Sequence, residues 1–413
     1  MSIVVKKFGG TSVGDISRIK NVARLIRDFR EQNPDTQVVA VVSAMAGETN
    51  RLIALARSCV VNPDERELDV LSSTGEQVSV ALLAMALIEL GLPAKSLLGQ
   101  QARISTDSRH TNAQIQAIDD STIRATLQQG FIPVIAGFQG ITESGDVTTL
   151  GRGGSDISAV AVAAALKAQA CYIYTDVEGV FSTDPRVCPQ ARLIDRISHD
   201  EMLELASLGA KVLHPRSVFF AMRYGVPLVV LSTFKPGPGT WIVRESELVE
   251  NPVVTGITYR ADEARLTLHK LPGGIQSLSR VFDALAKEEI FIDVISQSGI
   301  EDQLANVSFT VPDEVSSKAL ELAQALVPQL GAEGASIDRN ISKVSVVGIG
   351  MRSHTGVAAK MFEALAREQV DPQMISTSDI KISVIIPRKY CEIAVRALHE
   401  SFIEMKPELG QES

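Results

Sequence analysis

Cysteine is scarce in this chain of 413 residues. Its four cysteines, Cys59, Cys171, Cys188 and Cys391, are far apart, and no two of them form a Cys-x-x-Cys pair. This spacing argues against a zinc site or a disulfide-stapled scaffold and indicates free thiols in a reducing compartment. The six histidines form no His-x-x-x-His or His-Glu-x-x-His pattern, which excludes the common helical zinc motifs.

The chain also lacks a long apolar run. No stretch reaches the roughly 18 uninterrupted apolar residues that a membrane-spanning helix needs, and the longest candidate, 157–166, suits a buried helix. The residues after Met1 do not resemble a targeting segment, because the short apolar start leads directly into glycines. We therefore expect a cytoplasmic protein with no membrane partner.

Positive charge is in deficit, with 40 Lys and Arg against 49 Asp and Glu and a net charge of −9. This balance argues against broad nucleic-acid binding and leaves room for a local basic site. Two catalytic signatures are missing as well. The Gly-x-x-x-x-Gly-Lys-Ser/Thr phosphate loop does not occur, and neither does the Gly-x-Ser-x-Gly nucleophile elbow.

Strand-like and helix-like segments alternate over the first 230 or so residues. Buried β-branched runs predict strands, and apolar residues at helical spacing predict helices. The strands are expected at 3–8, 37–42, 132–136, 171–175 and 226–231, and the helices at 15–30, 78–90 and 157–168. Alternation of this kind predicts an α/β domain with a mostly parallel sheet flanked by helices.

An internal repeat follows a Gly- and Pro-rich turn at 235–240. Residues 281–298 and 361–378 align without gaps at a separation of 80, and eight of the eighteen positions are identical. Each copy lies in a strand–helix–strand–strand–helix order, which predicts two ferredoxin-like units. Two unrelated helices with similar apolar stripes are the weaker alternative.

Two glycine-rich loops each connect a strand to a helix. The first, 6–12, reads KKFGGTS, and the second, 149–156, reads TLGRGGSD. Glycines let the backbone approach an anion, and the helix that follows presents free N–H groups and a favourable dipole. Lys7 would supply charge for phosphate oxygens, and Arg152 would grip a carboxylate. The alternative is a pair of ordinary strand-to-helix turns, with Ser155 or Asp156 as a helix cap.

Three further loops carry polar residues that suit ligand binding. The segment 175–186 combines turn formers with acids, an aromatic residue and an arginine, as a nucleotide-holding loop would. Small polar residues follow the second strand at 43–50, and Glu76 opens a helix, where it would meet a cationic group. Each of these is ambiguous alone, since Asp184-Pro185 is also an ordinary turn signal.

Several longer motifs resemble the aspartate kinase family. They are KFGGTSV at 7–13, VVSAMAGETNRL at 41–52, STGEQ at 73–77, GFQG at 137–140, TLGRGGSD at 149–156, TDVEGVFSTDPRV at 175–187 and GAKVLHPRS at 209–217. The resemblance covers essentially the whole chain, and the repeat resembles the family's tandem ACT regulatory units. It implies an amino-acid-kinase domain at 1–245, a linker and strand at 246–262, and ACT units at 263–340 and 341–413.

The resemblance implies phosphorylation of the side-chain carboxylate of L-aspartate by ATP with Mg²⁺, the first step toward lysine, threonine and methionine. It implies no protein metal site. The catalytic residues would be Lys7, Asp156 and Lys211. The ATP site would comprise Lys7, Phe8, Gly9, Gly10, Thr175, Asp176, Phe181, Asp184, Arg186 and Lys211. Aspartate would be held by Ser43, Thr49, Glu76, Arg152, Gly153, Gly154 and Ser155.

The regulatory half departs further from the family pattern. Where an acidic strand is usual, this chain has Ala305-Asn306-Val307, which would weaken capture of an effector ammonium group. The effector candidates for lysine or threonine are Gln297, Ser298, Asn306, Ser378 and Asp379. The family pattern also implies a homodimer or higher oligomer formed through the ACT units. Two alternatives stay open: a non-catalytic amino-acid sensor with a kinase-like fold, and a sibling kinase for another carboxylate.

Overall fold

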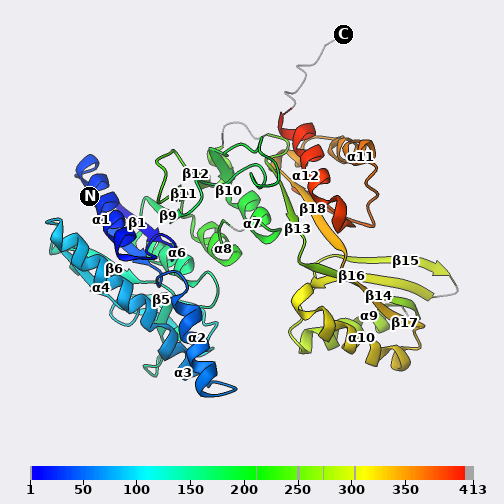
Figure 1. Ribbon diagram of the computed structural model, residues 1–413, viewed down its shortest axis with the longest axis horizontal. Coiled ribbons are helices and arrows are strands. Elements are labelled where there is room, and N and C mark those ends of the chain that lie inside the picture. The colour runs from blue at the N-terminus through cyan, green and yellow to red at the C-terminus, as the bar shows by residue number, and fades with distance from the viewer. Residues whose placement is uncertain (1, 211, 249–251, 273, 302–303, 405–413) are drawn as a thin grey trace, which may run out of the picture. The chain divides into compact units, whose positions relative to one another are not determined.

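The computed structural model describes residues 2–210, 212–248, 252–272, 274–301 and 304–404. Their contacts divide the chain into two compact units. The first contains the described residues of 1–181, 192–207 and 211–250, and the second those of 182–191, 208–210 and 251–413. Each unit has its own sheets and its own apolar core (Figure 1).

An eight-stranded sheet forms the centre of the first unit, in the order β10-β12-β11-β9-β1-β2-β6-β3. Its strands are β1 (Ser2–Phe8), β2 (Thr36–Val42), β3 (Ala94–Leu97), β6 (Ile132–Ala136), β9 (Ala170–Thr175), β10 (Arg196–Ser198), β11 (Leu228–Ser232) and β12 (Thr240–Val243). Only the β11–β12 pairing is antiparallel among the pairs of this sheet. The predicted mostly parallel α/β sheet is confirmed, and Val38–Val42 is buried throughout, as a strand covered on both faces requires.

Helices cover both faces of this sheet. They are α1 (Ile16–Gln32), α2 (Glu48–Cys59), α3 (Glu65–Ser72), α4 (Thr74–Glu89), α5 (Ser121–Gln128), α6 (Gly154–Leu166), α7 (His199–Ser207) and α8 (Pro215–Tyr224). Alternate residues of β1 point to opposite faces. Val4 and Phe8 pack in one core with α1 and α4, whereas Lys7 points the other way and reaches Asp156 in the first turn of α6.

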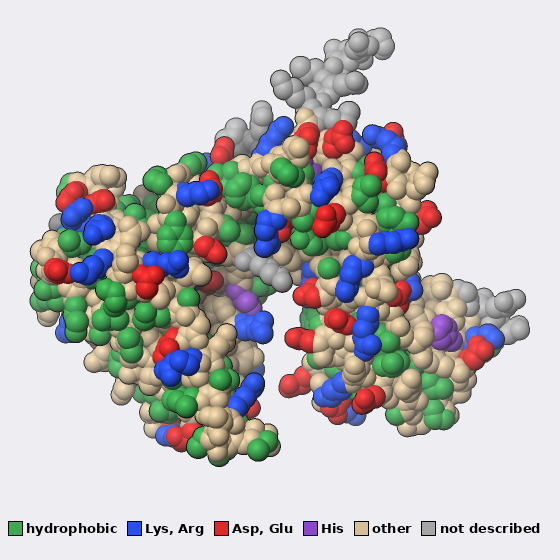
Figure 2. Space-filling model, viewed as in Figure 1, with side chains coloured by type: hydrophobic (Ala, Val, Ile, Leu, Met, Phe, Trp, Pro, Cys, Tyr) green, Lys and Arg blue, Asp and Glu red, His purple; other side chains and the backbone are tan. Residues whose placement is uncertain are grey.

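The helices α3 and α4 follow one another over Glu65–Glu89, a span that is long and apolar enough by composition to cross a membrane. However, 56% of its apolar window is buried inside the unit, where α4 packs against α1 and β6. We therefore interpret it as a core helix. On its outer side α4 exposes Val78, Met85 and Ile88, and Figure 2 shows hydrophobic side chains gathered over this helix.

A small second sheet in the first unit has the order β5-β4-β7-β8. It comprises β4 (Ile104–Thr106), β5 (Ile115–Ile118), β7 (Gln139–Ile141) and β8 (Val147–Thr149). The sequence analysis did not anticipate it, because strands of three or four residues are too short to show a periodic pattern. The second glycine loop leaves directly from β8, so this sheet fixes where that loop begins.

The first repeat copy folds as β14 (Glu263–Pro272), α9 (Gly274–Lys287), β15 (Ile295–Glu301), β16 (Leu304–Pro312), α10 (Ser316–Leu330) and β17 (Gly334–Asp338). Its antiparallel sheet has the order β15-β16-β14-β17. This is the βαββαβ arrangement of a ferredoxin-like unit. The apolar faces of α9 and α10 close the core over this sheet, around Val281, Leu285 and Phe309.

The second copy contains β18 (Ile341–Val347), α11 (Val357–Arg367), β19 (Met374–Ser378), β20 (Lys381–Pro387) and α12 (Cys391–His399). Its sheet has the order β13-β18-β20-β19. The strand β13 (Gly256–Arg260) precedes both copies in the chain and pairs antiparallel with β18, with Tyr259 opposite Val344. An earlier segment therefore occupies the edge that β17 occupies in the first copy.

Residues 182–191 leave β9 through 175–181 but pack within the second unit. The Ser182 carbonyl accepts a hydrogen bond from the Ile257 N–H at 2.7 Å, and the Val187 carbonyl accepts one from Arg396 Nε at 2.8 Å. The sequence alone predicts one continuous catalytic segment here, because local patterns do not show that a loop packs with a distant element.

A buried ion cluster joins the two repeat copies. Lys343 on β18 is 1% exposed, and its Nζ lies 2.7 Å from Glu263 Oε1 on β14 and also contacts the Asp293 carboxylate. A charge this deeply buried persists only with its partners, since removing one of them leaves an uncompensated charge.

We predict that Lys343→Met lowers the free energy of unfolding of the second unit by about 3–5 kcal/mol, because Asp293 and Glu263 lose their shared cation. Urea unfolding followed by circular dichroism measures this change. Fluorescence of Trp241, the single tryptophan, reports the first unit separately.

The matched control is Lys318→Met, which removes the exposed Lys318–Glu288 pair at 2.8 Å from the same unit. This change is expected to cost at most about 1 kcal/mol. Equal effects of the two substitutions would contradict the prediction.

Candidate active site

A cavity of about 560 Å³ lies in the first unit, at the edge of the central sheet where β1 and β2 end. Ten of the sequence-predicted residues line it: Lys7, Gly10, Ser43, Thr49, Glu76, Arg152, Gly153, Gly154, Ser155 and Asp156. They come from four separate segments, which the parallel sheet brings to one edge, as expected for ligand sites in such folds.

Two glycines allow the loops around this cavity to meet. A Cβ atom on Gly10 would lie 3.0 Å from the Ala44 carbonyl oxygen, and one on Gly75 would lie 2.8 Å from Ala44 Cβ. Ala44 is therefore packed between the loop after β1 and the first turn of α4. A side chain at either glycine would push apart the loops that carry Lys7, Ser43 and Glu76.

Lys7 carries positive charge to the cavity wall. Its Nζ lies 2.5 Å from Asp156 Oδ1, and its side chain is 10% exposed. The ion pair holds the lysine beside the first turn of α6, whose N–H groups and dipole also favour an anion. This corner of the cavity is thus suited to phosphate or carboxylate oxygens.

Glu76 presents a buried carboxylate to the same cavity. Its Oε1 accepts a hydrogen bond from the Ala44 N–H at 2.9 Å, whereas Oε2 is buried and has no hydrogen-bond partner among the described residues. Burial raises the pKa of Glu76 to about 7, because the charged form loses its hydration. A buried carboxylate oxygen with no partner among the described residues is suited to accept a hydrogen bond from a ligand ammonium group.

The second glycine loop presents Arg152. Gly151 and Gly153 both have φ of +72°, which disfavours other residues, and a Cβ on Gly153 would lie 2.4 Å from His214 Cβ. Between them the Arg152 side chain is exposed and forms no ion pair within the described part of the chain. Its guanidinium is available for bidentate contact with a carboxylate.

Sequence reasoning missed Asp69, which also lines the cavity. It is fully buried on α3 and accepts hydrogen bonds from His110 Nδ1, the Thr111 N–H and Thr149 Oγ1. No motif marks it, because its partners lie 41–80 residues away along the chain. Thr111 on the cavity wall was missed for the same reason, whereas Phe138 lies in the GFQG motif at 137–140 and was not singled out from it.

Apart from Lys7 and Gly10, the predicted nucleotide residues do not line this cavity. Thr175 and Asp176 end β9 and hydrogen-bond to each other at 3.0 Å, and they do not line the cavity. Asp184 and Arg186 belong to the second unit and pair at 2.8 Å. Phe181 belongs to the first unit, and Lys211 lies outside the described residues.

Phe8 and Gly9 precede the cavity. The Phe8 side chain is fully buried and stacks on Tyr174 with ring centroids 4.7 Å apart, so it fills the core and does not face a ligand. The Gly9 N–H donates to the Tyr174 carbonyl at 3.2 Å, which fixes the first turn of the loop. A role for Phe8 in nucleotide binding stays a prediction that concerns its backbone alone.

The effector candidates fall into two groups. Gln297 and Ser298 lie on β15, opposite Asn306 and its neighbours on β16, and Asn306 Oδ1 accepts the Lys270 N–H at 2.9 Å. Ser378 and Asp379 instead line a separate cavity of about 320 Å³ beside the first turn of α11, together with Arg352 and His354.

All four cysteines are free thiols. Within the described residues one group has metal-ligand chemistry, namely Cys188, His399 and Glu404. Both ring nitrogens of His399 already have hydrogen-bond partners at 2.8 Å, Ser182 Oγ and Glu404 Oε1. This arrangement is accounted for by hydrogen bonding, so we assign no metal to it.

Comparison with known proteins agrees with this geometry. The profile of the amino acid kinase family matches residues 2–232, and an ACT domain profile matches residues 344–402. The chain is 53% identical to the aspartokinase of Pseudomonas aeruginosa, over 97% of this chain and 98% of that protein. The chain belongs to the aspartokinase family. The expected pairing of a kinase domain with ACT units is therefore confirmed at the level of the family.

Two solved aspartokinase structures have the same fold. E. coli aspartokinase III in complex with aspartate and ADP, in its R-state, gives a TM-score of 0.79 at 27% identity and covers 97% of this chain and 99% of its own. The same enzyme in complex with lysine and aspartate, in its T-state, gives a TM-score of 0.76 at 27% identity, with the same coverage.

The raised pKa of Glu76 predicts a pH dependence of stability. Between pH 4.5 and about 7 the folded state holds a proton that the unfolded state has lost, so stability falls by about 3 kcal/mol as pH rises through this window. Glu76→Gln removes this loss and keeps an acceptor for the Ala44 N–H. Without ligand, we therefore expect its melting temperature to exceed the wild-type value by more at pH 8 than at pH 5.

Thermal unfolding of both proteins at the two pH values measures this difference. Glu89→Gln, at the exposed end of the same helix, is the control and is expected to follow the wild-type pH profile. Parallel wild-type and Glu76→Gln profiles would contradict the assignment.

Proposed function

We propose that this aspartokinase-family enzyme transfers the γ-phosphoryl group of ATP to the side-chain carboxylate of L-aspartate. The products are 4-phospho-L-aspartate and ADP. This reaction is the first step of the route to lysine, threonine and methionine. The observation that carries the proposal is that one cavity is lined by the cations Lys7 and Arg152 and by Glu76, which has a buried carboxylate oxygen without a partner among the described residues. This combination suits a ligand with two carboxylates and one ammonium group.

The substrate fits these groups by charge. Arg152 would bind the α-carboxylate as a bidentate pair, and Glu76 would accept hydrogen bonds from the α-ammonium group, which favours its ionised form. The small polar residues of the two glycine loops would complete the contacts, namely Ser43, Thr49, Gly153, Gly154 and Ser155. Aspartate is thereby held with its side chain directed toward Lys7.

Catalysis then rests on position and charge. The aspartate side-chain carboxylate is ionised at pH 7, so its oxygen attacks the γ-phosphorus without a general base while the bond to the ADP oxygen breaks. Lys7, oriented by Asp156, would stabilise the charge on the transferring group. Lys211 would contribute a second cation.

ATP and Mg²⁺ complete the proposed reaction. The nucleotide would be held by the loop after β1 and by the segment after β9, through Phe8, Gly9, Gly10, Thr175, Asp176, Phe181, Asp184, Arg186 and Lys211. Of the carboxylates on the cavity wall, Asp69 is saturated with donors and Asp156 is paired with Lys7. Mg²⁺ would therefore be held mainly by phosphate oxygens and water, an arrangement that suits this ion. It would neutralise phosphate charge.

The proposal predicts aspartate-dependent product formation. With ATP, Mg²⁺, L-aspartate and hydroxylamine, the purified protein is expected to form aspartyl hydroxamate. Lys7→Ala is expected to lower kcat by roughly 10²–10³-fold, because a charge that stabilises the transition state is lost. Lys20→Ala, which removes an exposed lysine of the same unit, is the control and is expected to retain activity.

The assay also separates the alternatives. Product with glutamate or another carboxylate, and none with aspartate, would identify a sibling kinase. Calorimetric binding of an amino acid with no turnover of ATP would favour a sensor. The sensor is the weaker alternative, because the residues expected for catalysis and substrate binding line one cavity. They are Lys7, Glu76, Arg152 and Asp156.

We propose further that lysine or threonine regulates the enzyme through the repeat copies. Two places are suited to an amino acid: the β15–β16 ladder at Gln297 and Asn306, and the cavity at Ser378 and Asp379. The second offers a carboxylate for an ammonium group, and Arg352 and the first turn of α11 for a carboxylate. The first contributes amides and hydroxyls only, so we favour the second.

The first repeat copy has a sheet edge that is suited to self-association. β15 lies at the edge of its sheet, with Ile295 and nearby Phe291 exposed, and an apolar sheet edge favours pairing with a second copy. We therefore propose a homodimer or higher oligomer through the ACT units.

The cysteines bear on the cellular location. Four free thiols suit a reducing compartment, so we place the enzyme in the cytoplasm.

Titration of activity with lysine and threonine, separately and together, tests the regulatory proposal. If either inhibits, Asp379→Asn is expected to raise its half-inhibitory concentration about tenfold or more, since a charge-assisted hydrogen bond is lost. Gln297→Ala is expected to change it less than twofold. The reverse order would move the effector site to the β15–β16 ladder.

A further inference from the structure

Asp69 is a fully buried carboxylate to which the proposed reaction gives no role. It lies in the middle of α3 and forms part of the cavity wall. Within the described residues its only ion-pair partner is His110, and no lysine or arginine lies within ion-pair distance. A buried acid of this kind is costly unless donors replace its lost hydration.

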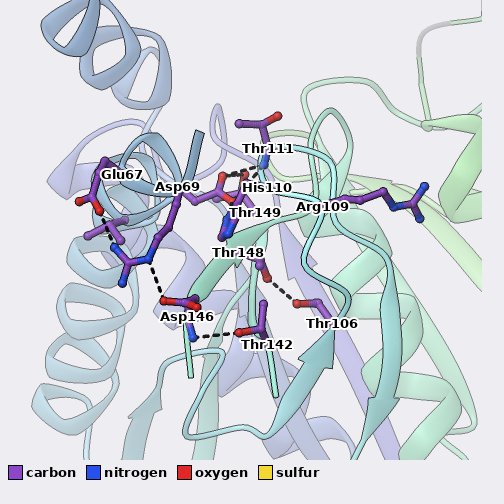
Figure 3. A network of polar contacts seen from close by, with 12 residues as sticks. Glu67, Asp69, Thr106, Arg109, His110, Thr111, Thr142, Asp146, Thr148 and Thr149 are labelled. Carbon is purple, nitrogen blue, oxygen red and sulfur yellow. Dashed lines mark hydrogen bonds and ion pairs between the residues drawn. The ribbon is translucent and has the colours of Figure 1, made fainter. Parts of the chain in front are cut away.

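Those donors come from two separate segments (Figure 3). Thr149 Oγ1, at the end of β8, lies 2.5 Å from Asp69 Oδ1. From the loop before β5, the Thr111 N–H lies 3.0 Å from both carboxylate oxygens, and His110 Nδ1 lies 2.9 Å from Oδ2. Hydrogen bonds to an ionised acceptor are short and strong, so Asp69 binds both segments to α3.

Both segments border the glycine loop that carries Arg152. Thr149 is three residues before Arg152, and its carbonyl accepts the Ala113 N–H at 2.9 Å. A Cβ on Gly151 would lie 3.0 Å from Asn112 Oδ1 and 3.1 Å from the Thr111 carbonyl oxygen. The segment that Asp69 holds is therefore the surface against which the glycine loop packs.

We propose that Asp69 is a positioning residue for the amino-acid substrate, and this inference rests on the proposed function. It fixes the start and the support of the loop at 151–154, so that Arg152 and the first turn of α6 face the cavity. A negative charge on the wall of a cavity for an anionic substrate opposes binding by itself. Asp69 favours the reaction because it fixes the loop, since small displacements of substrate-binding groups lower the reaction rate by large factors.

Steady-state kinetics of Asp69→Ala tests the proposal. KM for aspartate is expected to rise by roughly 10–100-fold, while KM for ATP changes less than about twofold. Thr149→Val removes one of the donors and is expected to raise KM for aspartate in the same direction. The double variant is expected to show less than the product of the two effects, because both remove one interaction.

The conservative variant provides the rescue. In Asp69→Asn the amide oxygen still accepts from Thr149 Oγ1 and the Thr111 N–H, and the amide NH₂ can donate to the other neutral tautomer of His110. We expect its KM for aspartate to lie within about fivefold of wild type. An Asp69→Asn variant as impaired as Asp69→Ala would overturn the proposal.

The matched control is Asp146→Ala. Asp146 also links α3 to the β7–β8 hairpin, through Arg66 Nε at 2.8 Å, but its side chain is 30% exposed and does not line the cavity. Its KM values are expected to match wild type, and melting temperatures check that all variants fold. Equal changes of both KM values in Asp69→Ala, or the same pattern in Asp146→Ala, would overturn the inference. A wild-type enzyme inactive with aspartate would instead refute the proposed function.

Discussion

The site depends on the close packing of Ala44 between two glycines. Gly10 allows the loop after β1 to approach the Ala44 carbonyl, and Gly75 allows the first turn of α4 to approach its Cβ. The Ala44 N–H donates to Glu76 Oε1, and the other carboxylate oxygen has no partner in the part of the chain that the structure describes. Because neither glycine has a side chain, the loop after β1, the loop that contains Ala44 and the first turn of α4 pack at van der Waals distance. The cationic and anionic groups of the cavity therefore keep a fixed separation.

Charge in this cavity is compensated in three different ways. Lys7 is paired with Asp156, Asp69 is surrounded by hydrogen-bond donors, and Glu76 has one donor and a raised pKa. Of these three carboxylates, Glu76 is the one with a buried oxygen that has neither a hydrogen bond nor an ion pair among the described residues, which identifies it as the group that a ligand completes. The overall charge of −9 does not show this pattern, because it counts groups that are far from the cavity.

The second unit shows how one sequence repeat forms two different sheets. Both copies form a four-stranded sheet, but the second takes its edge strand from β13, which precedes the first copy in the chain. The chain therefore passes through the second copy's sheet before it forms the first. Lys343 on β18, buried against Glu263 and Asp293, adds an ionic link between the copies, so the two are held together by covalent order and by charge.

The central strands, the main helices, the repeat and ten residues of the cavity wall could be predicted from the amino-acid sequence. These were predictable because each depends on a local pattern: β-branched runs, apolar spacing, or glycines at the end of a strand. The family motifs added the identity of the substrate groups. The parallel sheet then required their loops to meet at one edge.

Other features of the site and the fold depend on contacts between segments that are distant in the sequence. Asp69 carries no local signal, since its donors come from residues 41–80 positions away, and the short strands β4, β5, β7 and β8 show no period. The packing of 182–191 with the second unit and the place of β13 likewise depend on long-range contacts. Local patterns fix what a segment forms, whereas burial and hydrogen bonding between distant segments decide which of its side chains meet.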